Sequence, residues 1–176
     1  MNQIKKLIKD KYIFVDLDTL VIPQDNLNNH VTFVYLASKP RTWLIKTINK
    51  VRNKGIWVCG CVTDLVELRD KLLWLEENKG LGNFDGAFWY VPESHWHKFL
   101  NYFKNLEKSR ISENNTCIQC SNGLIIEGTA ATMWDWVETH NMVNLNESVY
   151  LGNAIPNIMC AEQYGVKSYN VDGFGK

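Results

Sequence analysis

Residues 12–23 read YIFVDLDTLVIP. Residues 12–15 are strand-forming and apolar enough for a buried strand, which would run directly into Asp16 and Asp18. Two carboxylates this close repel each other, so a positive group is expected near them. The pair could also simply begin a turn, where Asp is common. The stretch therefore predicts a strand that ends either in a charged site or in a polar turn.

The rest of the chain alternates short apolar runs with amphipathic stretches. Strands are predicted at residues 12–17, 31–37, 56–62, 86–91, 116–120, 123–127, 148–153 and 166–171. Helices are predicted at residues 1–10, 38–55, 63–80, 93–108, 128–142 and 155–165. This alternation predicts one α/β domain over residues 1–176, with a parallel Rossmann-like sheet and helices on both faces. Residues 82–122 are expected to form a small cap-like insert.

Composition bounds the class of protein. Apolar residues make up 45% of the 176 residues and include seven Trp, which argues against a disordered chain. No apolar run approaches the roughly 20 residues that a membrane helix needs, and the first residues are too charged for a signal peptide. We therefore expect a cytoplasmic protein without a membrane partner. The five Cys are an odd number and are expected to be free thiols.

The C-terminal part carries a second set of signals. Residues 122–171 read NGLIIEGTAATMWDWVETHNMVNLNESVYLGNAIPNIMCAEQYGVKSYNV. Together with Asp-x-Asp after the first strand, this tail resembles the haloacid dehalogenase-like (HAD) superfamily of phosphohydrolases, in its sugar-phosphatase-like branch. The resemblance spans most of the chain. It implies that Asp16 is the nucleophile, that Asp18 is the acid/base, and that Thr63 serves the second motif. It also implies Mg²⁺ held near Asp16, Asp18 and Asn153.

The sequence departs from the family pattern at several positions. Thr19 stands where the family usually has Gly, and Leu20 where it prefers Thr. Glu127 stands where the family has Lys, and Asn153 and Asn157 replace two acids. These changes weaken a hard-cation cage and remove a positive charge from the transition state. The resemblance thus implies a catalytically impaired pseudoenzyme without a cofactor.

The alternative is an active Mg²⁺-dependent phosphohydrolase. It would form an aspartyl-phosphate on Asp16 and recruit a cation from elsewhere, such as Lys98. The fold alone does not decide between this enzyme and a binding or regulatory protein.

A binding protein needs a surface, and two are candidates. Lys46, Lys50 and Lys54 recur at helical spacing and form either a solvated face or a strip that contacts phosphates. Trp134 and Trp136 fall on different faces of one predicted helix, so at least one should be exposed as a possible anchor. We therefore expect a macromolecular partner, a protein with or without nucleic acid.

Charge and residue usage add weak indications about that partner. Residues 1–111 carry 17 Lys and Arg against 12 Asp and Glu, a net +5, and residues 112–176 carry 2 against 7, a net −5. The abundance of Asn, Lys and Ile is typical of AT-rich genomes such as those of phages. A factor acting in the host cytoplasm on a host enzyme, for instance the transcription machinery, is one function of this kind.

The cysteines leave one metal alternative open. CIQC at residues 117–120 is half of a zinc pattern, and CGC at residues 59–61 could supply two more thiolates. The two pairs lie far apart in the sequence, so buried thiols are the preferred interpretation.

Overall fold

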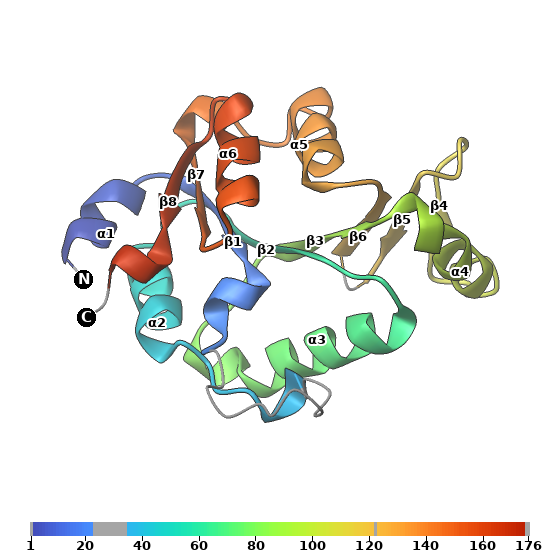
Figure 1. Cartoon of the computed structure of the whole chain (residues 1–176), viewed down its shortest axis with the longest axis horizontal. Helices are drawn as coiled ribbons and strands as arrows, with labels where there is room; N and C mark the ends of the chain where they lie inside the picture. Colours follow the sequence, from blue (N-terminus) through green and yellow to red (C-terminus); the bar gives the residue numbers. More distant parts are fainter. Residues whose placement is uncertain (1, 23–34, 122, 175–176) are drawn as a thin grey trace.

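A single eight-stranded sheet organises the chain in a computed structural model that describes residues 2–22, 35–121 and 123–174. Its order is β4-β5-β6-β3-β2-β1-β7-β8 (Figure 1). The strands are β1 (Tyr12–Asp16), β2 (Ile56–Cys61), β3 (Gly86–Val91), β4 (Arg110–Ile111), β5 (Cys117–Cys120), β6 (Gly123–Glu127), β7 (Ser148–Gly152) and β8 (Lys167–Asn170). All neighbours pair in parallel except β4 with β5 and β5 with β6. The predicted α/β, Rossmann-like sheet is confirmed.

Helices cover both faces of this sheet, as predicted (Figure 1). They are α1 (Asn2–Ile8), α2 (Thr42–Lys50), α3 (Leu65–Glu77), α4 (Glu93–Phe103), α5 (Ala130–Thr139) and α6 (Ile155–Gln163). Apolar side chains of α1 to α4 share one core cluster with one face of the sheet. Those of α5 and α6 share a second cluster with the other face. None of the helices in the described part of the chain is long and apolar enough to cross a membrane.

The strand alternation explains why the sheet is buried on both sides. In β1, Ile13 and Val15 belong to the cluster under α1 to α4, and Phe14 belongs to the cluster under α5 and α6. Successive side chains of a strand point to opposite faces, so an unbroken apolar run supplies both cores. β1 pairs with β2 on one side and β7 on the other, which places Asp16 at the middle of the sheet.

Two predicted elements before β2 differ from the structure. Of the strand predicted at 31–37, residues 31–34 lie outside the described residues, and Tyr35–Ala37 is a 3-10 turn, η2, closed by the Ser38 amide on the Tyr35 carbonyl. The helix predicted at 38–55 is shorter, because Pro40 precedes α2 and the polar residues before Gly55 end it. Lys54 therefore lies beyond the helix.

The insert expected at 82–122 does not start where the sequence analysis placed it. β3 lies between β2 and β6 and is a central strand of the sheet. Phe88 and Tyr90 face one core cluster while Trp89 and Val91 face the other, as a central strand requires. Between β3 and β6 the described chain forms α4 and the strands β4 and β5. These two strands extend the sheet at one edge.

Candidate functional site

Asp16 ends β1 and is almost enclosed, with 8% of its surface exposed. Its Oδ1 accepts a hydrogen bond from the backbone N–H of Asp18 at 3.0 Å. Its Oδ2 accepts from the Tyr150 hydroxyl at 3.1 Å and from the Asn157 amide nitrogen at 3.5 Å. These donors come from the turn after β1, from β7 and from α6, so the fold itself satisfies both carboxylate oxygens.

This enclosure changes the acidity of the group. Burial first, and the nearby charge of Asp18 second, raise the pKa of Asp16, which stands at about 6 against the usual 3.8. The hydrogen bonds from Asp18 and Tyr150 and the positive charge of Lys71 lower it, without cancelling the effect of burial. The carboxyl therefore takes up a proton at a higher pH than an ordinary aspartate does, as the pH falls towards 6.

The positive group expected near the two aspartates is Lys71 of α3. Its Nζ lies 3.8 Å from Asp18 Oδ1 and 3.5 Å from Glu67 Oε1, and it donates to the Cys61 carbonyl at 2.9 Å. Only 8% of the Lys71 side chain is exposed, whereas 66% of the Asp18 side chain is. The Tyr35 hydroxyl also donates to Asp18 Oδ1, at 3.3 Å. Sequence reasoning missed Lys71, although a lysine among apolar residues of a helix is a signal of a paired cation.

A cavity of about 850 Å³ opens beside this cluster. Its lining comprises Asp18, Val21, Tyr35, Cys61, Asp64, Val66, Glu67, Asp70, Lys71 and Asn153. Four acids against one lysine give the described lining a formal charge of −3. Such a lining attracts cations and repels phosphate esters.

Residues at or just after the ends of three strands, β1, β2 and β7, meet at this cavity. Asp18, Cys61 and Asn153 line the same cavity, and Asp16 adjoins it through its neighbour Asp18. The Thr63 hydroxyl instead donates to Glu67 at 3.4 Å. Asp64, rather than Thr63, caps α3 by accepting from the Glu67 amide.

Glu127, at the position of the family lysine, lies away from this cavity. It ends β6, which stands three places from β1 in the sheet. At about 4.8 Å between neighbouring strands, this spacing separates the two strands by roughly 14 Å. Glu127 is also outside the described lining of the cavity. The charge reversal inferred from the family pattern therefore does not act directly on Asp16.

Lys46, Lys50 and Lys54, predicted to lie on one helix face, differ in the structure in exposure and in contacts. Lys46 and Lys50 are exposed on α2. Lys54 is half-buried, pairs with Glu147 Oε2 at 3.1 Å and lies 4.9 Å over the ring of Tyr12. Only the first two are therefore available to a partner without breaking an existing contact.

The two tryptophans of α5 differ in solvent exposure, as expected. Trp134 is 1% exposed and packs edge-on against Phe14 and Tyr150. Trp136 is half-buried between Phe88 and the stacked ring of His140. Trp136 is thus the member of the pair that reaches the surface.

The residues present do not suit a bound Mg²⁺. Asp16 Oδ2 already accepts from Tyr150 and Asn157, and Asn153 contributes an uncharged amide. Over the described residues, no three His, Cys, Asp or Glu side chains are grouped to hold a metal. The same finding leaves the zinc alternative without a ligand cluster, because the cysteines of the described residues are included in it.

Comparison with known proteins adds no relative to this picture. The chain matches no protein-family model and no curated protein. The resemblance to the haloacid dehalogenase-like superfamily therefore rests on the sequence motifs alone.

Proposed function

We propose that this chain is a non-catalytic binding or regulatory protein built on a haloacid dehalogenase-like scaffold. The observation that supports this most directly is the state of Asp16. A carboxylate that attacks phosphorus must present a free, ionised oxygen to the substrate. Here both oxygens accept internal hydrogen bonds, the group is buried, and its pKa is raised to about 6.

The electrostatics of the cavity support the same proposal. The lining carries a formal −3 among its described residues, and Asn153 and Asn157 supply no charge to a metal. A phosphate ester would therefore meet repulsion without the cation that usually offsets it.

One observation favours the alternative of an active phosphohydrolase. Lys71, not the exposed Lys98 of α4, brings a positive charge to Asp18. However, Lys71 already contacts Asp18, Glu67 and the Cys61 carbonyl, so its charge is shared among internal acceptors. We therefore rank the enzyme second.

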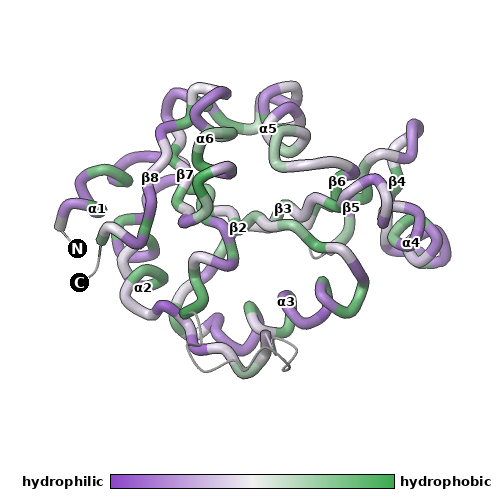
Figure 2. The backbone as a smooth tube through the Cα atoms, in the orientation of Figure 1, coloured by the Kyte–Doolittle hydropathy of each residue, from purple (hydrophilic) through white to green (hydrophobic). Residues whose placement is uncertain are grey.

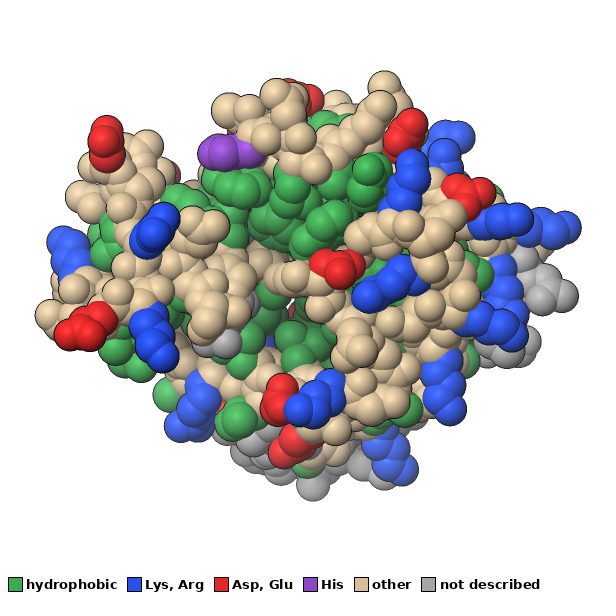
Figure 3. Space-filling model, turned by 180° about the vertical axis from the view of Figure 1, so that it is seen from behind, with side chains coloured by type: hydrophobic (Ala, Val, Ile, Leu, Met, Phe, Trp, Pro, Cys, Tyr) green, Lys and Arg blue, Asp and Glu red, His purple; other side chains and the backbone are tan. Residues whose placement is uncertain are grey.

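For the binding role, the lysines at one end of the molecule provide the best surface. Lys and Arg side chains gather over α1 and α2, on the right of the view from behind (Figure 3). The exposed members include Lys6 and Lys9 of the α1 region and Lys46 and Lys50 of α2. A basic surface of this kind favours an acidic protein partner through charge complementarity.

A phosphatase assay tests the proposal directly. The purified chain should hydrolyse a panel of phosphate esters with Mg²⁺ no faster than its Asp16→Asn variant. Turnover that Asp16→Asn abolishes would favour the enzyme instead.

The partner is tested separately by pull-down from cell extract. Lys46→Glu with Lys50→Glu should release bound acidic proteins, and the release should resemble that caused by high salt. As a matched control, Lys104→Glu with Lys108→Glu changes the same charge at exposed positions after α4. Equal capture of acidic proteins by wild type and both double variants would contradict a role for the basic surface. Capture that nuclease treatment abolishes would indicate a nucleic-acid partner instead.

A further inference from the structure

A second cavity, of about 1000 Å³, lies on the other side of α3 from the Asp18 cavity. Hydrophobic and hydrophilic residues alternate along α3 (Figure 2), and Val66 lines both cavities. Glu67, Asp70 and Lys71 line the Asp18 cavity, whereas Leu65, Leu68, Leu72 and Leu75 line the second one. We call this second cavity the α3 groove, and it plays no part in the function proposed above.

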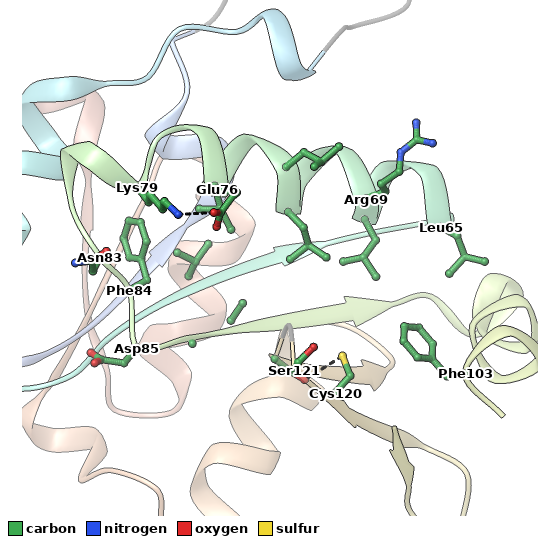
Figure 4. A pocket seen from close by; sticks show the side chains of 18 of the residues that line it. Leu65, Arg69, Glu76, Lys79, Asn83, Phe84, Asp85, Phe103, Cys120 and Ser121 are labelled. Carbon is green, nitrogen blue, oxygen red and sulfur yellow. Dashed lines mark hydrogen bonds and ion pairs between the residues drawn. The ribbon is translucent and has the colours of Figure 1, made fainter. Parts of the chain in front are cut away.

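The α3 groove is walled mainly by apolar side chains. Its described lining includes the four leucines just named, Val58 and Ala87 on the strands, and Phe84, Phe103 and Leu106 at its sides. Figure 4 shows side chains of α3 pointing towards the strands, with Phe103 and Cys120 across the space. Gly86 and Gly123 also line it, so parts of the wall carry no side chain.

The charged residues of the groove are already paired with one another or with neighbours. Lys79 contacts Glu76 at 2.5 Å, and Arg69 contacts Asp70 at 3.1 Å. Figure 4 shows the guanidinium of Arg69 pointing away from the cavity. Asp85 accepts from the Ile56 amide at 2.7 Å and lies 3.8 Å from Arg52. A charged ligand would therefore lose its hydration without gaining an unpaired counter-charge.

The dimensions of the groove indicate a small and elongated occupant. The lining follows α3 from Leu65 at one end to Lys79 just beyond the other. At 1.5 Å per residue, this is a path of roughly 20 Å. The volume of about 1000 Å³ stands at the upper end of small-molecule pockets, which span about 300–1000 Å³.

We propose that the α3 groove binds an uncharged small molecule with an extended aliphatic chain. Burial of that chain against the leucines supplies the affinity, and the paired charges at the rim select against ionised headgroups. The inference holds whether or not Asp16 is catalytic, because it uses none of the residues around Asp16.

A fluorescence titration tests the proposal with a neutral probe. N-phenyl-1-naphthylamine should bind the purified chain in a saturable 1:1 manner, with increased emission. 1-Decanol should displace it, and decanoate should need an at least tenfold higher concentration, because its carboxylate finds no free partner. Absence of binding, or equal displacement by the two competitors, would overturn the proposal.

Variants locate the binding to the groove. Leu72→Asn should weaken probe binding about tenfold, because it replaces an aliphatic wall by an amide. Ile155→Asn is the matched control, since Ile155 is 57% exposed on α6 and lies outside the groove, and it should bind like wild type. Equal binding by both variants would contradict the assignment.

A third measurement needs no substitution and so does not depend on the folding of a variant. Cys120 lines the groove, whereas Cys160 lies on α6. Saturating 1-decanol should slow the reaction of Cys120 with N-ethylmaleimide several-fold and leave Cys160 unchanged, as followed by peptide mass spectrometry. Unchanged labelling of Cys120 would overturn the proposal. A decrease in probe binding at protein concentrations where the chain dimerises would also overturn the proposal, because a second copy of the chain would then cover the groove.

Discussion

The hydroxyl of Tyr150 donates a hydrogen bond to Oδ2 of Asp16 at 3.1 Å, across the boundary between β7 and β1. The two residues are 134 positions apart in the chain. The contact exists only because β7 pairs with β1 in parallel and places the tyrosine beside the end of that strand. We infer that Asp16 has a structural role, and the following predictions test this role and its surroundings.

Replacement of Tyr150 by Phe should destabilise the protein by about 1–3 kcal/mol, because a buried acceptor loses its donor. Urea denaturation at pH 7.5 measures the change in the free energy of unfolding. Tyr164→Phe is the matched control: it removes the solvent-exposed 2.6 Å hydrogen bond from the half-buried Tyr164 to Asp135, and should cost less than about 0.5 kcal/mol. Equal losses for the two variants would contradict a special role for the Asp16 contact.

The raised pKa of Asp16 predicts a specific dependence of stability on pH. The pKa is about 6 in the folded protein against the usual 3.8 of an aspartate, so the folded state binds more protons between these values. Its contribution to stability is therefore present at low pH and is lost as pH rises through about 6. Asp16→Asn removes this titration. Relative to wild type, the variant should gain on the order of 1 kcal/mol between pH 5 and pH 7.5 in denaturant unfolding. A difference that does not change with pH would refute the assignment.

Lys71 should matter more for stability than an exposed lysine with a similar ion pair. Lys71→Met keeps most of the aliphatic stem but removes the charge next to Asp18, Glu67 and the Cys61 carbonyl. We expect a loss of about 1–3 kcal/mol, since the ammonium is largely buried while its acid partners are partly exposed. Lys79→Met, which breaks the exposed pair with Glu76, should change stability by less than about 0.5 kcal/mol. Thermal and urea unfolding of both variants provide the comparison.

Restoring the two acids of the family pattern should create a response to Mg²⁺. Asn153→Asp with Asn157→Asp adds two carboxylates beside Asp16 and Asp18, which repel one another unless a cation joins them. The double variant should have a lower melting temperature than wild type in EDTA and regain stability in millimolar Mg²⁺. Wild type should not respond, and neither should Asn101→Asp with Asn105→Asp on and after α4. No Mg²⁺ effect on the double variant would count against the family alignment.

The thiols give a prediction that needs no variant. The five cysteines are free in the structure, so denatured protein should show five reactive thiols per chain both with and without reductant. A lower count without reductant would reveal a disulfide that the structure lacks.

The fold class followed from local pattern. Apolar runs such as IWVCGC and GAFWYV can be buried on both faces only within a covered parallel sheet, and both became central strands. Asp64 capped α3 as its residue type predicts, because an N-cap interacts only with its own helix. The free thiols and the division between Trp134 and Trp136 were likewise predictable from composition and helical spacing.

The boundaries and partners of the site were not predictable in this way. The family pattern puts Glu127 at the position of a lysine, but strand order separates its strand from that of Asp16 by three positions. The sequence could mark Lys71 as a paired cation but could not name its partner, and only the packing of α3 beside the end of β1 brought it to Asp18. Lys54 fell in a predicted binding stripe, yet its charge pairs with Glu147, which is 93 residues away.

The sequence by itself therefore determined the elements of this protein, because strand and helix formation depends on residues a few positions apart. Only the tertiary structure determined the hydrogen bonds and the burial of Asp16. Its donors come from Tyr150 and Asn157, and its burial comes from the elements around the end of β1. Hydrogen bonding and desolvation depend on neighbours in space, and these are set by the order of strands in the sheet rather than by the order of residues in the chain.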